Sequence, residues 1–305
     1  MLWLLSSLTL ATVFDTLTVA PNSLIRDEQL GSKSKFWFDL NGNAWLFKQA
    51  REHTGEDWAE KVAAEIALRI GVDAAEVELA EYQGRRGSAS WSFVQPGESL
   101  VHGNEILAGQ ILGYDPQKRL KQSDHTLANI IAAIDKMVPS VSTLVLEDLA
   151  GYLVLDALVG NTDRHHENWG FLTRYEDTDT GRRLIFRLAP SFDHASSLGR
   201  ELRDDRAEAI LAAGGIEAYV RHGYGGIYWR SNDRKGANPL QLVELASQMY
   251  PQFFGKSLRA VAAMPIAELL AVVDEVPAAV MSDASRRFTK ALLAFTHTVL
   301  SGLAP

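Results

Sequence analysis

The sequence predicts an α+β protein with two lobes, a small lobe rich in β-strands followed by a larger, mainly helical lobe. Two observations carry this prediction. Before residue 95 most segments favour strands, with one helix among them, whereas after it most segments carry helix signals. Pro96-Gly97 interrupts the pattern between these regions, so we expect the lobes to comprise residues 1–95 and 96–305.

The composition is that of a protein with a packed core, because 47% of the 305 residues are hydrophobic and 22% are charged. Cysteine is absent. This excludes disulfide scaffolds, cysteine-ligated zinc, iron–sulfur clusters and thiol nucleophiles, and it fits a reducing, cytoplasmic location. The net charge of −8 repels a phosphate backbone, so we expect no direct nucleic-acid binding.

The apolar residues 1–20 admit two interpretations. Residues 18–20 faintly resemble a signal cleavage site, but the first basic residue is Arg26, so the basic region of a signal peptide is missing. Asp15 interrupts the apolar run, which disfavours a membrane span. The valines and threonines of residues 13–20 favour a buried N-terminal strand, which is the interpretation that we adopt.

In the first lobe, Asn41-Gly42 separates two aromatic runs and predicts a hairpin over residues 36–48. A second hairpin is expected over residues 77–94, with its turn at residues 83–87. Between the hairpins, apolar residues recur every four positions and predict a helix that Gly71 ends. The apolar stripe comprises Trp58, Val62, Ile66 and Ile70. The expected capping box consists of Thr54 and Asp57.

In the second lobe, residues 144–159 are almost continuously apolar and predict a helix buried on most sides. A third hairpin is expected over residues 169–188, with its turn at residues 177–181. Asn238 before Pro239 predicts a capped helix start, and Ser282 and Asp283 are expected to cap a long C-terminal helix.

A polar loop between the buried helix and the third hairpin is the richest candidate site. Asp163 and Asn168 lie five residues apart there, and a carboxylate and an amide oxygen suit a base together with a hard cation such as Mg²⁺. Asp193 follows the last strand of the hairpin and is placed to reach the same cation. The alternative for Asp193 is a helix cap or turn residue.

Lys48 ends an apolar strand and therefore needs a charge partner or access to solvent. Glu65 on the predicted helix is the expected partner, whereas Glu60 and Lys61 are expected to be solvated. The alternative for Lys48 is a residue that protects the sheet edge.

Upstream, Gly31, Ser32, Lys33 and Ser34 have the composition of a phosphate-binding loop. They match neither of the nucleotide-binding motifs G-x-x-x-x-G-K-[ST] and G-x-G-x-x-G. An ordinary turn is the alternative.

Several other constellations fail. The histidines lack zinc spacing, and no serine-hydrolase elbow occurs. Residues 221–235 form a loose basic stretch with aromatic neighbours, which fits either a solvated face or a surface for an acidic or phosphorylated partner.

The order of these parts is more specific than any one of them. A Gly/Ser/Lys loop, a strand lysine, a helix glutamate, an Asp-x₄-Asn loop and a later Asp follow one another as in protein kinases. The sequence resembles the HipA-like serine/threonine kinases over roughly residues 25–300, most specifically in residues 161–168. The resemblance implies a two-lobed protein-kinase-like fold and an enzyme that uses ATP and Mg²⁺ to phosphorylate a protein.

The resemblance also implies individual roles. Asp163 is expected to be the catalytic base, with Asn168 and Asp193 as metal ligands. Lys48 and Glu65 are expected to form the ion pair that positions the nucleotide, assisted by the phosphate loop. The remaining expected residues are Arg164, which positions the loop, His165, which either orients it or is simply buried, and Ser92, Phe93 and Val94, which form the inter-lobe hinge that receives adenine.

Three departures from the family are visible. Only residues 1–30 precede the phosphate loop, which implies a short form without the N-terminal subdomain. His194 follows Asp193 where eukaryotic kinases carry glycine. Family kinases autophosphorylate a serine of the phosphate loop, and Ser32 and Ser34 are equal candidates here. The substrate and an antitoxin partner stay open, as do two alternatives, a phosphotransferase for small molecules or lipids and an inactive binding module.

Overall fold

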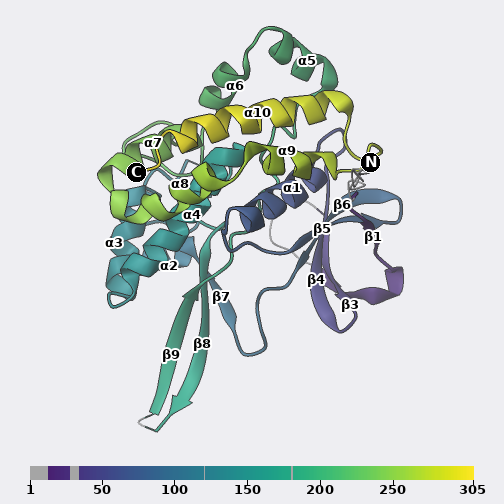
Figure 1. Cartoon of the computed structure of the whole chain (residues 1–305). Coiled ribbons are helices and arrows are strands. Elements are labelled where there is room, and N and C mark those ends of the chain that lie inside the picture. The colour runs from purple at the N-terminus through teal and green to yellow at the C-terminus, as the bar shows by residue number, and fades with distance from the viewer. Residues whose placement is uncertain (1–12, 28–33, 120, 180) are drawn as a thin grey trace, which may run out of the picture.

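The computed structural model describes residues 13–27, 34–119, 121–179 and 181–305, and it shows the two expected lobes (Figure 1). The first lobe is built on a six-stranded sheet in the order β1–β5–β6–β4–β3–β2. All neighbouring strands are antiparallel except β1 and β5. The strands are β1 (Thr16–Thr18), β2 (Leu24–Asp27), β3 (Lys35–Leu40), β4 (Asn43–Gln49), β5 (Val77–Tyr82) and β6 (Arg85–Trp91), with a short 3₁₀ turn η1 (Pro21–Ser23) before β2.

Both predicted hairpins of this lobe are present. Asn41 and Gly42 adopt φ angles of 56° and 80°, the left-handed pair that a tight two-residue turn requires. Gln83 and Gly84 do the same, with φ angles of 49° and 73°. The second turn is therefore shorter than expected, and β6 begins at Arg85.

The N-terminal strand forms, but the expectation that it is buried is wrong. β1 lies at one edge of the sheet, where it pairs with β5, and its side chains are exposed or half-buried. Its edge position, with β5 as its one neighbour in the described sheet, explains this exposure. Val19, which follows the strand, is buried in the core of the sheet lobe, and Leu17 of β1 packs against that core while half-buried.

The helix α1 (Glu56–Arg69) carries the predicted apolar stripe, and Gly71 follows its end with φ at 70°. The expected capping box is wrong. The helix begins one residue later than that box requires, with Gly55 at the N-cap. Asp57 instead accepts from Arg86 of β6, at 2.9 and 3.0 Å, so its carboxylate fastens the helix to the sheet.

The second lobe is mainly helical. Its helices are α2 (Gly103–Gln110), α3 (Leu127–Met137), α4 (Ser142–Val159), α5 (Asp204–Ala212), α6 (Ile216–His222), α7 (Pro239–Met249), α8 (Pro251–Ala263), α9 (Ile266–Asp274) and α10 (Asp283–Ser301). The predicted caps of α7 and α10 are confirmed, because the Asn238 side chain accepts from the Gln241 amide and Ser282 accepts from the Ser285 amide. The predicted buried helix is α4, which ends at Gly160.

The third hairpin is also present. It consists of β8 (Gly170–Thr178) and β9 (Gly181–Leu188), and β7 (Ser99–His102) pairs with the base of β8. The outer half of this hairpin projects away from the body of the molecule (Figure 1).

Among the residues that the structure describes, two hydrophobic clusters form the core. A small one lies under the sheet and includes Phe36, Phe38 and Phe47. The large one joins α1 to the helices of the second lobe, so α1 packs between the lobes. The division at residue 95 stays a prediction. No helix in the described part of the chain combines the length and the apolar character that crossing a bilayer requires.

Candidate active site

The polar loop that follows α4 is held by the end of that helix. Gly160 ends the helix in the left-handed conformation, with φ at 66°. Asn161 then folds back, because its amide group donates to the Asp156 carboxylate at 2.8 Å. Its carbonyl oxygen accepts from the Asp163 backbone N–H at 3.1 Å. A buried helix residue thereby fixes the backbone at Asp163.

Asp163 and Asn168 lie across the same loop. The Asn168 side-chain nitrogen donates to the Asp163 carbonyl oxygen at 2.7 Å, while Asn168 itself is almost fully buried. This bond fixes the amide so that its oxygen is the atom available to a cation. The Asp163 side chain is exposed, and the Ser196 hydroxyl lies 3.5 Å from its carboxylate.

Arg164 joins this loop to the segment that carries Asp193. One guanidinium nitrogen donates to the Asn168 carbonyl at 2.6 Å and to the Phe192 carbonyl at 3.3 Å. Another donates to the Ser191 hydroxyl at 2.9 Å. One buried side chain therefore brings together the backbones that carry Asn168 and Asp193, which lie far apart in the sequence.

The charge of Arg164 is balanced by Asp156, the one acidic residue in the buried half of α4. The two side chains form a bidentate pair with both distances at 2.8 Å, and each is about 4% exposed. Burial by itself lowers the pKa of Arg164, but the Asp156 carboxylate outweighs it and raises that pKa. The guanidinium is therefore permanently charged.

Lys48 reaches Asp193 across the junction of the lobes. Its ammonium lies 3.0 Å from the Asp193 carboxylate and 3.4 Å from that of Glu60. Burial by itself lowers the pKa of Lys48, but Asp193 and Glu60 outweigh it and raise that pKa. The alternative of an edge-protecting lysine is excluded, because β4 lies inside the sheet between β6 and β3.

Two expectations for α1 are wrong. Glu65 is not the partner of Lys48, since its carboxylate contacts Lys61 and Arg69, both at 2.9 Å. Glu60 and Lys61 are not solvated, since they are 1% and 4% exposed. The physical reason is that the first half of α1 is buried on all sides between the sheet and the second lobe, so the apolar stripe does not identify its inner face.

Asp193 itself is held in an unusual backbone conformation. Its φ angle is 61°, in the left-handed region that non-glycine residues rarely adopt. The next residue anchors it, because the His194 N–H donates to Glu60 at 3.2 Å and the His194 ring lies 2.7 Å from the Ser191 hydroxyl. Burial lowers the pKa of His194 well below its usual value, so this ring is neutral.

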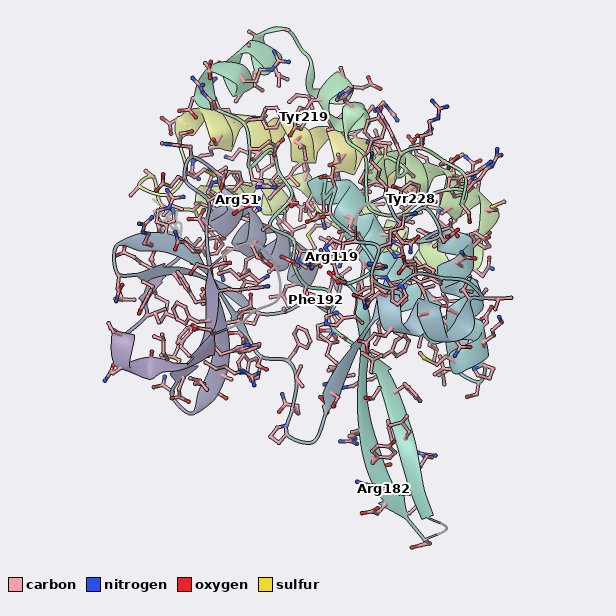
Figure 2. The ribbon with its side chains drawn as sticks, turned by 180° about the vertical axis from the view of Figure 1, so that it is seen from behind. Arg51, Arg119, Arg182, Phe192, Tyr219 and Tyr228 are labelled. Carbon is pink, nitrogen blue, oxygen red and sulfur yellow. The ribbon has the colours of Figure 1, made fainter. Side chains whose placement is uncertain are left out.

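The predicted hinge, Ser92–Val94, leaves the sheet after β6 and leads toward β7. The Ser92 N–H donates to the Ala44 carbonyl at 2.9 Å, which ties the segment to β4. The Phe93 ring lies 5.5 Å from that of Phe192, between centroids. Figure 2 shows Phe192 where the two lobes meet. The hinge therefore lies beside the Asp193 segment.

Other expected residues are placed as follows. Gly31, Ser32 and Lys33 lie outside the described residues. Ser34 is exposed, and its carbonyl accepts from the Gln49 N–H at 3.1 Å. His165 is half-buried, and its Nδ1 accepts from the Glu167 N–H at 3.2 Å, which closes a turn inside the loop.

The donors near Asp193 suit a hard cation that also binds phosphate. No group of three histidine, cysteine or acidic residues within the described ranges has the arrangement of a metal site. Mg²⁺ does not need such a group of three side chains, since it usually takes one or two protein oxygens and completes its shell with water and phosphate. The Asn168 amide oxygen, oriented as described, and the half-exposed Asp193 carboxylate fit that requirement.

Sequence reasoning missed two residues of this arrangement, Asp156 and Glu60. Asp156 carried a usable signal, because one carboxylate in an apolar run implies a buried cation. Glu60 carried none, because its position relative to the apolar stripe favours solvent.

Comparison with known proteins identifies the family of this chain. The protein-family model of the HipA-like C-terminal domain matches residues 29–250 of the sequence, which is well over half of the chain. The chain belongs to the HipA-like family. A serine/threonine-protein kinase of Helicobacter pylori, CtkA, is 28% identical over 163 residues, which span 52% of this chain and 46% of that protein.

Solved structures confirm the kinase-like fold of this family member. The crystal structure of the H. pylori proinflammatory kinase CtkA matches with a TM-score of 0.78 at 20% identity, over 95% of this chain and 98% of that one. HipA of Shewanella oneidensis, solved with HipB and operator DNA, matches with a TM-score of 0.54 at 13% identity, over 91% of this chain and 64% of that one.

Proposed function

We propose that this HipA-like protein is an ATP- and Mg²⁺-dependent serine/threonine kinase that phosphorylates a hydroxyl group of another protein. The observation that carries the proposal is the convergence on Asp193. Lys48 contacts its carboxylate from the sheet lobe, and Arg164 binds the backbone beside it from the loop that holds Asp163 and Asn168. Phosphoryl transfer requires this combination of positioning and charge neutralisation.

Each residue then has a definite task. Lys48 binds nucleotide phosphates and is held by Glu60, in the role first expected for Glu65. Asn168 and Asp193 hold the metal, which when bound neutralises charge on the phosphates. Arg164 is a positioning residue, because it contacts backbone and Ser191 rather than the reacting atoms. The hinge Ser92–Val94 receives adenine.

Asp163 accepts the proton of the substrate hydroxyl. Its side chain is exposed at the end of α4, where an acceptor can approach, and two hydrogen bonds fix the loop around it. A carboxylate at this place is a weak base, so its contribution is to orient the hydroxyl and take the proton as the bond to phosphorus forms.

Three finer features are part of the proposal. Autophosphorylation at Ser32 or Ser34 regulates the enzyme. The protein acts in the cytoplasm. It has an antitoxin-type partner, for which the support is the HipB complex of the Shewanella relative.

The test is incubation of the full chain with [γ-³²P]ATP and Mg²⁺, alone and with a mixture of serine and threonine peptides. We expect label on peptide and on the protein. Asp163→Asn and Asp193→Asn should lower the rate by about three orders of magnitude or more, because each removes a group that acts on the transferring phosphoryl. Glu201→Gln, an exposed change on the same lobe, is the control and should leave the rate unchanged.

Label on phosphate-accepting alcohols or lipids but not on peptides contradicts the protein-kinase assignment and favours a small-molecule phosphotransferase. No label, together with no change in melting temperature on adding ATP and Mg²⁺, contradicts catalysis altogether and favours a binding module.

A further inference from the structure

The basic stretch noted in the sequence lies directly against the candidate active-site loop. Gly226 packs on that loop so closely that a Cβ at this position would lie 2.7 Å from the Arg164 carbonyl oxygen and from the His165 nitrogen. A Cβ at Gly223 would lie 3.0 Å from the Thr162 side chain. Residues 223–238 are here called the basic loop. The first residues of this loop therefore contact the active-site loop both before Asp163, at Thr162, and after it, at Arg164 and His165.

Two backbone hydrogen bonds join the first residues of the basic loop to its last residues. The Gly225 N–H donates to the Ala237 carbonyl at 2.8 Å, and the Ala237 N–H donates to the Ile227 carbonyl at 2.7 Å. One residue further along the loop, the Tyr228 N–H donates to the His125 carbonyl at 2.9 Å. Tyr228 is buried, and Figure 2 shows it in the helical lobe. These bonds fix the start and the end of the loop on the lobe that carries Asp163.

The loop presents three cations to solvent. Arg230, Arg234 and Lys235 are all exposed. Within the part of the chain that the structure describes, neither arginine has an ion-pair partner, and the Lys235 ammonium lies 4.0 Å from the centre of the Tyr224 ring. Asp233 is the acidic residue of the loop, and its carboxylate accepts from the Arg230 backbone N–H at 2.9 Å, so it shapes the turn.

This arrangement differs from that of the neighbouring basic residue. Arg221 contacts Glu217 at 2.9 Å and Glu244 at 3.2 Å, so its charge is balanced within the protein. The cations of the basic loop are not balanced in this way, although the chain as a whole carries a net charge of −8. A local positive surface on an acidic protein selects a negatively charged partner.

The distance to the active site fits a peptide. Arg230 is four residues from Gly226, so its Cα lies at most about 14 Å from the Gly226 Cα, which packs on the backbone next to Asp163. Lys235 is nearer still, because the next residue, Gly236, packs against Gly225. An extended peptide covers about 3.3 Å per residue, so acidic side chains within about four positions of the acceptor come within reach of these cations.

We propose that the basic loop is the docking surface for an acidic segment of the substrate protein, next to the serine or threonine that is phosphorylated. The inference rests on the proposed function for the identity of the occupant. Charge complementarity favours an acidic peptide over a nucleic acid, because three cations neutralise few phosphates and the rest of the surface repels a polyanion.

The test measures binding directly, so that it does not depend on turnover. Two fluorescein-labelled dodecapeptides are compared by anisotropy, one with a serine among glutamates and one with the same serine among glutamines. We expect the glutamate peptide to bind about tenfold more tightly at low salt, which corresponds to about 1.4 kcal/mol. The difference should shrink at 0.5 M NaCl, because exposed charges are screened.

The decisive variant is Arg230→Gln/Arg234→Gln/Lys235→Gln. It should bind both peptides equally. The matched control is Arg174→Gln/Arg182→Gln/Arg183→Gln, which removes three exposed cations from the projecting β8–β9 hairpin and should keep the preference.

Equal binding of the two peptides to the unmodified protein overturns the proposal, as does an unchanged preference in the basic-loop variant. Tighter binding of a poly-dT dodecamer than of the glutamate peptide also overturns it, in favour of a nucleic-acid surface. Transfer of label from [γ-³²P]ATP to peptide or protein, followed in parallel, separates the two proposals. If it is present while the peptides bind equally, the docking inference fails and the kinase proposal stands. If it is absent while the preference persists, the kinase proposal fails and an acidic-segment site remains.

Discussion

Replacing Asp156 by asparagine tests the structural centre of the site. The change keeps the size of the side chain but removes the charge that accompanies Arg164 in the interior. Both side chains are about 4% exposed, and both of their hydrogen bonds measure 2.8 Å, so the guanidinium cannot turn to water for compensation. Removing one partner of such a buried pair costs about 3–5 kcal/mol.

The assay is urea unfolding at pH 7, followed by tryptophan fluorescence. We expect Asp156→Asn to lower the free energy of unfolding by about 3–5 kcal/mol. The matched control is Glu244→Gln, which breaks a half-exposed ion pair with Arg221 at 3.2 Å and should cost less than about 1 kcal/mol.

A second variant separates charge burial from packing. Asp156→Leu/Arg164→Met removes both charges, so it should recover part or all of the about 3–5 kcal/mol that Asp156→Asn loses. It should nevertheless be inactive, because Asn168 and Phe192 lose the donor that joins them. A loss below about 1 kcal/mol in Asp156→Asn, or a double variant that keeps full activity, refutes this reasoning.

Three other predictions follow from the structure. Glu60→Gln should slow phosphoryl transfer at least about tenfold in the ATP assay while Glu65→Gln stays within about twofold, because Glu60 contacts Lys48 whereas Glu65 pairs with Lys61 and Arg69, and equal losses contradict the assignment. Lys48→Met should raise the KM for ATP and lower kcat, whereas unchanged steady-state kinetics would place the nucleotide elsewhere. Burial lowers the pKa of His125 to about 3 and that of His166 to about 4. Unfolded histidines titrate near 6.5, so the unfolded state binds more protons below that pH, and stability should fall by about 2 kcal/mol per histidine between pH 7 and 5. Urea midpoints measured across this range check it, and an equally steep profile in His125→Asn/His166→Gln is the contrary outcome.

The sequence predicts well those features that local chemistry determines. The Asn41-Gly42 turn requires two left-handed residues, and few residue pairs supply them. The Asn238 cap is likewise decided within four residues. Asp163 and Asn168 could be assigned to one loop for the same reason, since the bond between them spans five positions.

The features that sequence reasoning missed depend on tertiary packing. The stripe on α1 indicates which residues are apolar, but not that the first half of the helix is enclosed by both lobes, and Glu60 is buried for that reason. The edge position of β1 likewise follows from the strand order, which no local pattern reveals. Asp156 shows the intermediate case, because its burial was predictable and its partner was not.

In the proposed enzyme, Asn168 and Asp193 hold a metal beside a nucleotide that Lys48 contacts. A crystal structure of the chain with Mn²⁺ and a non-hydrolysable ATP analogue tests it most directly, because Mn²⁺ gives an anomalous signal. We expect an anomalous peak within bonding distance of the Asn168 amide oxygen and the Asp193 carboxylate, with the Lys48 ammonium on the phosphates. A peak on other side chains, or a nucleotide bound away from the junction of the lobes, would contradict it.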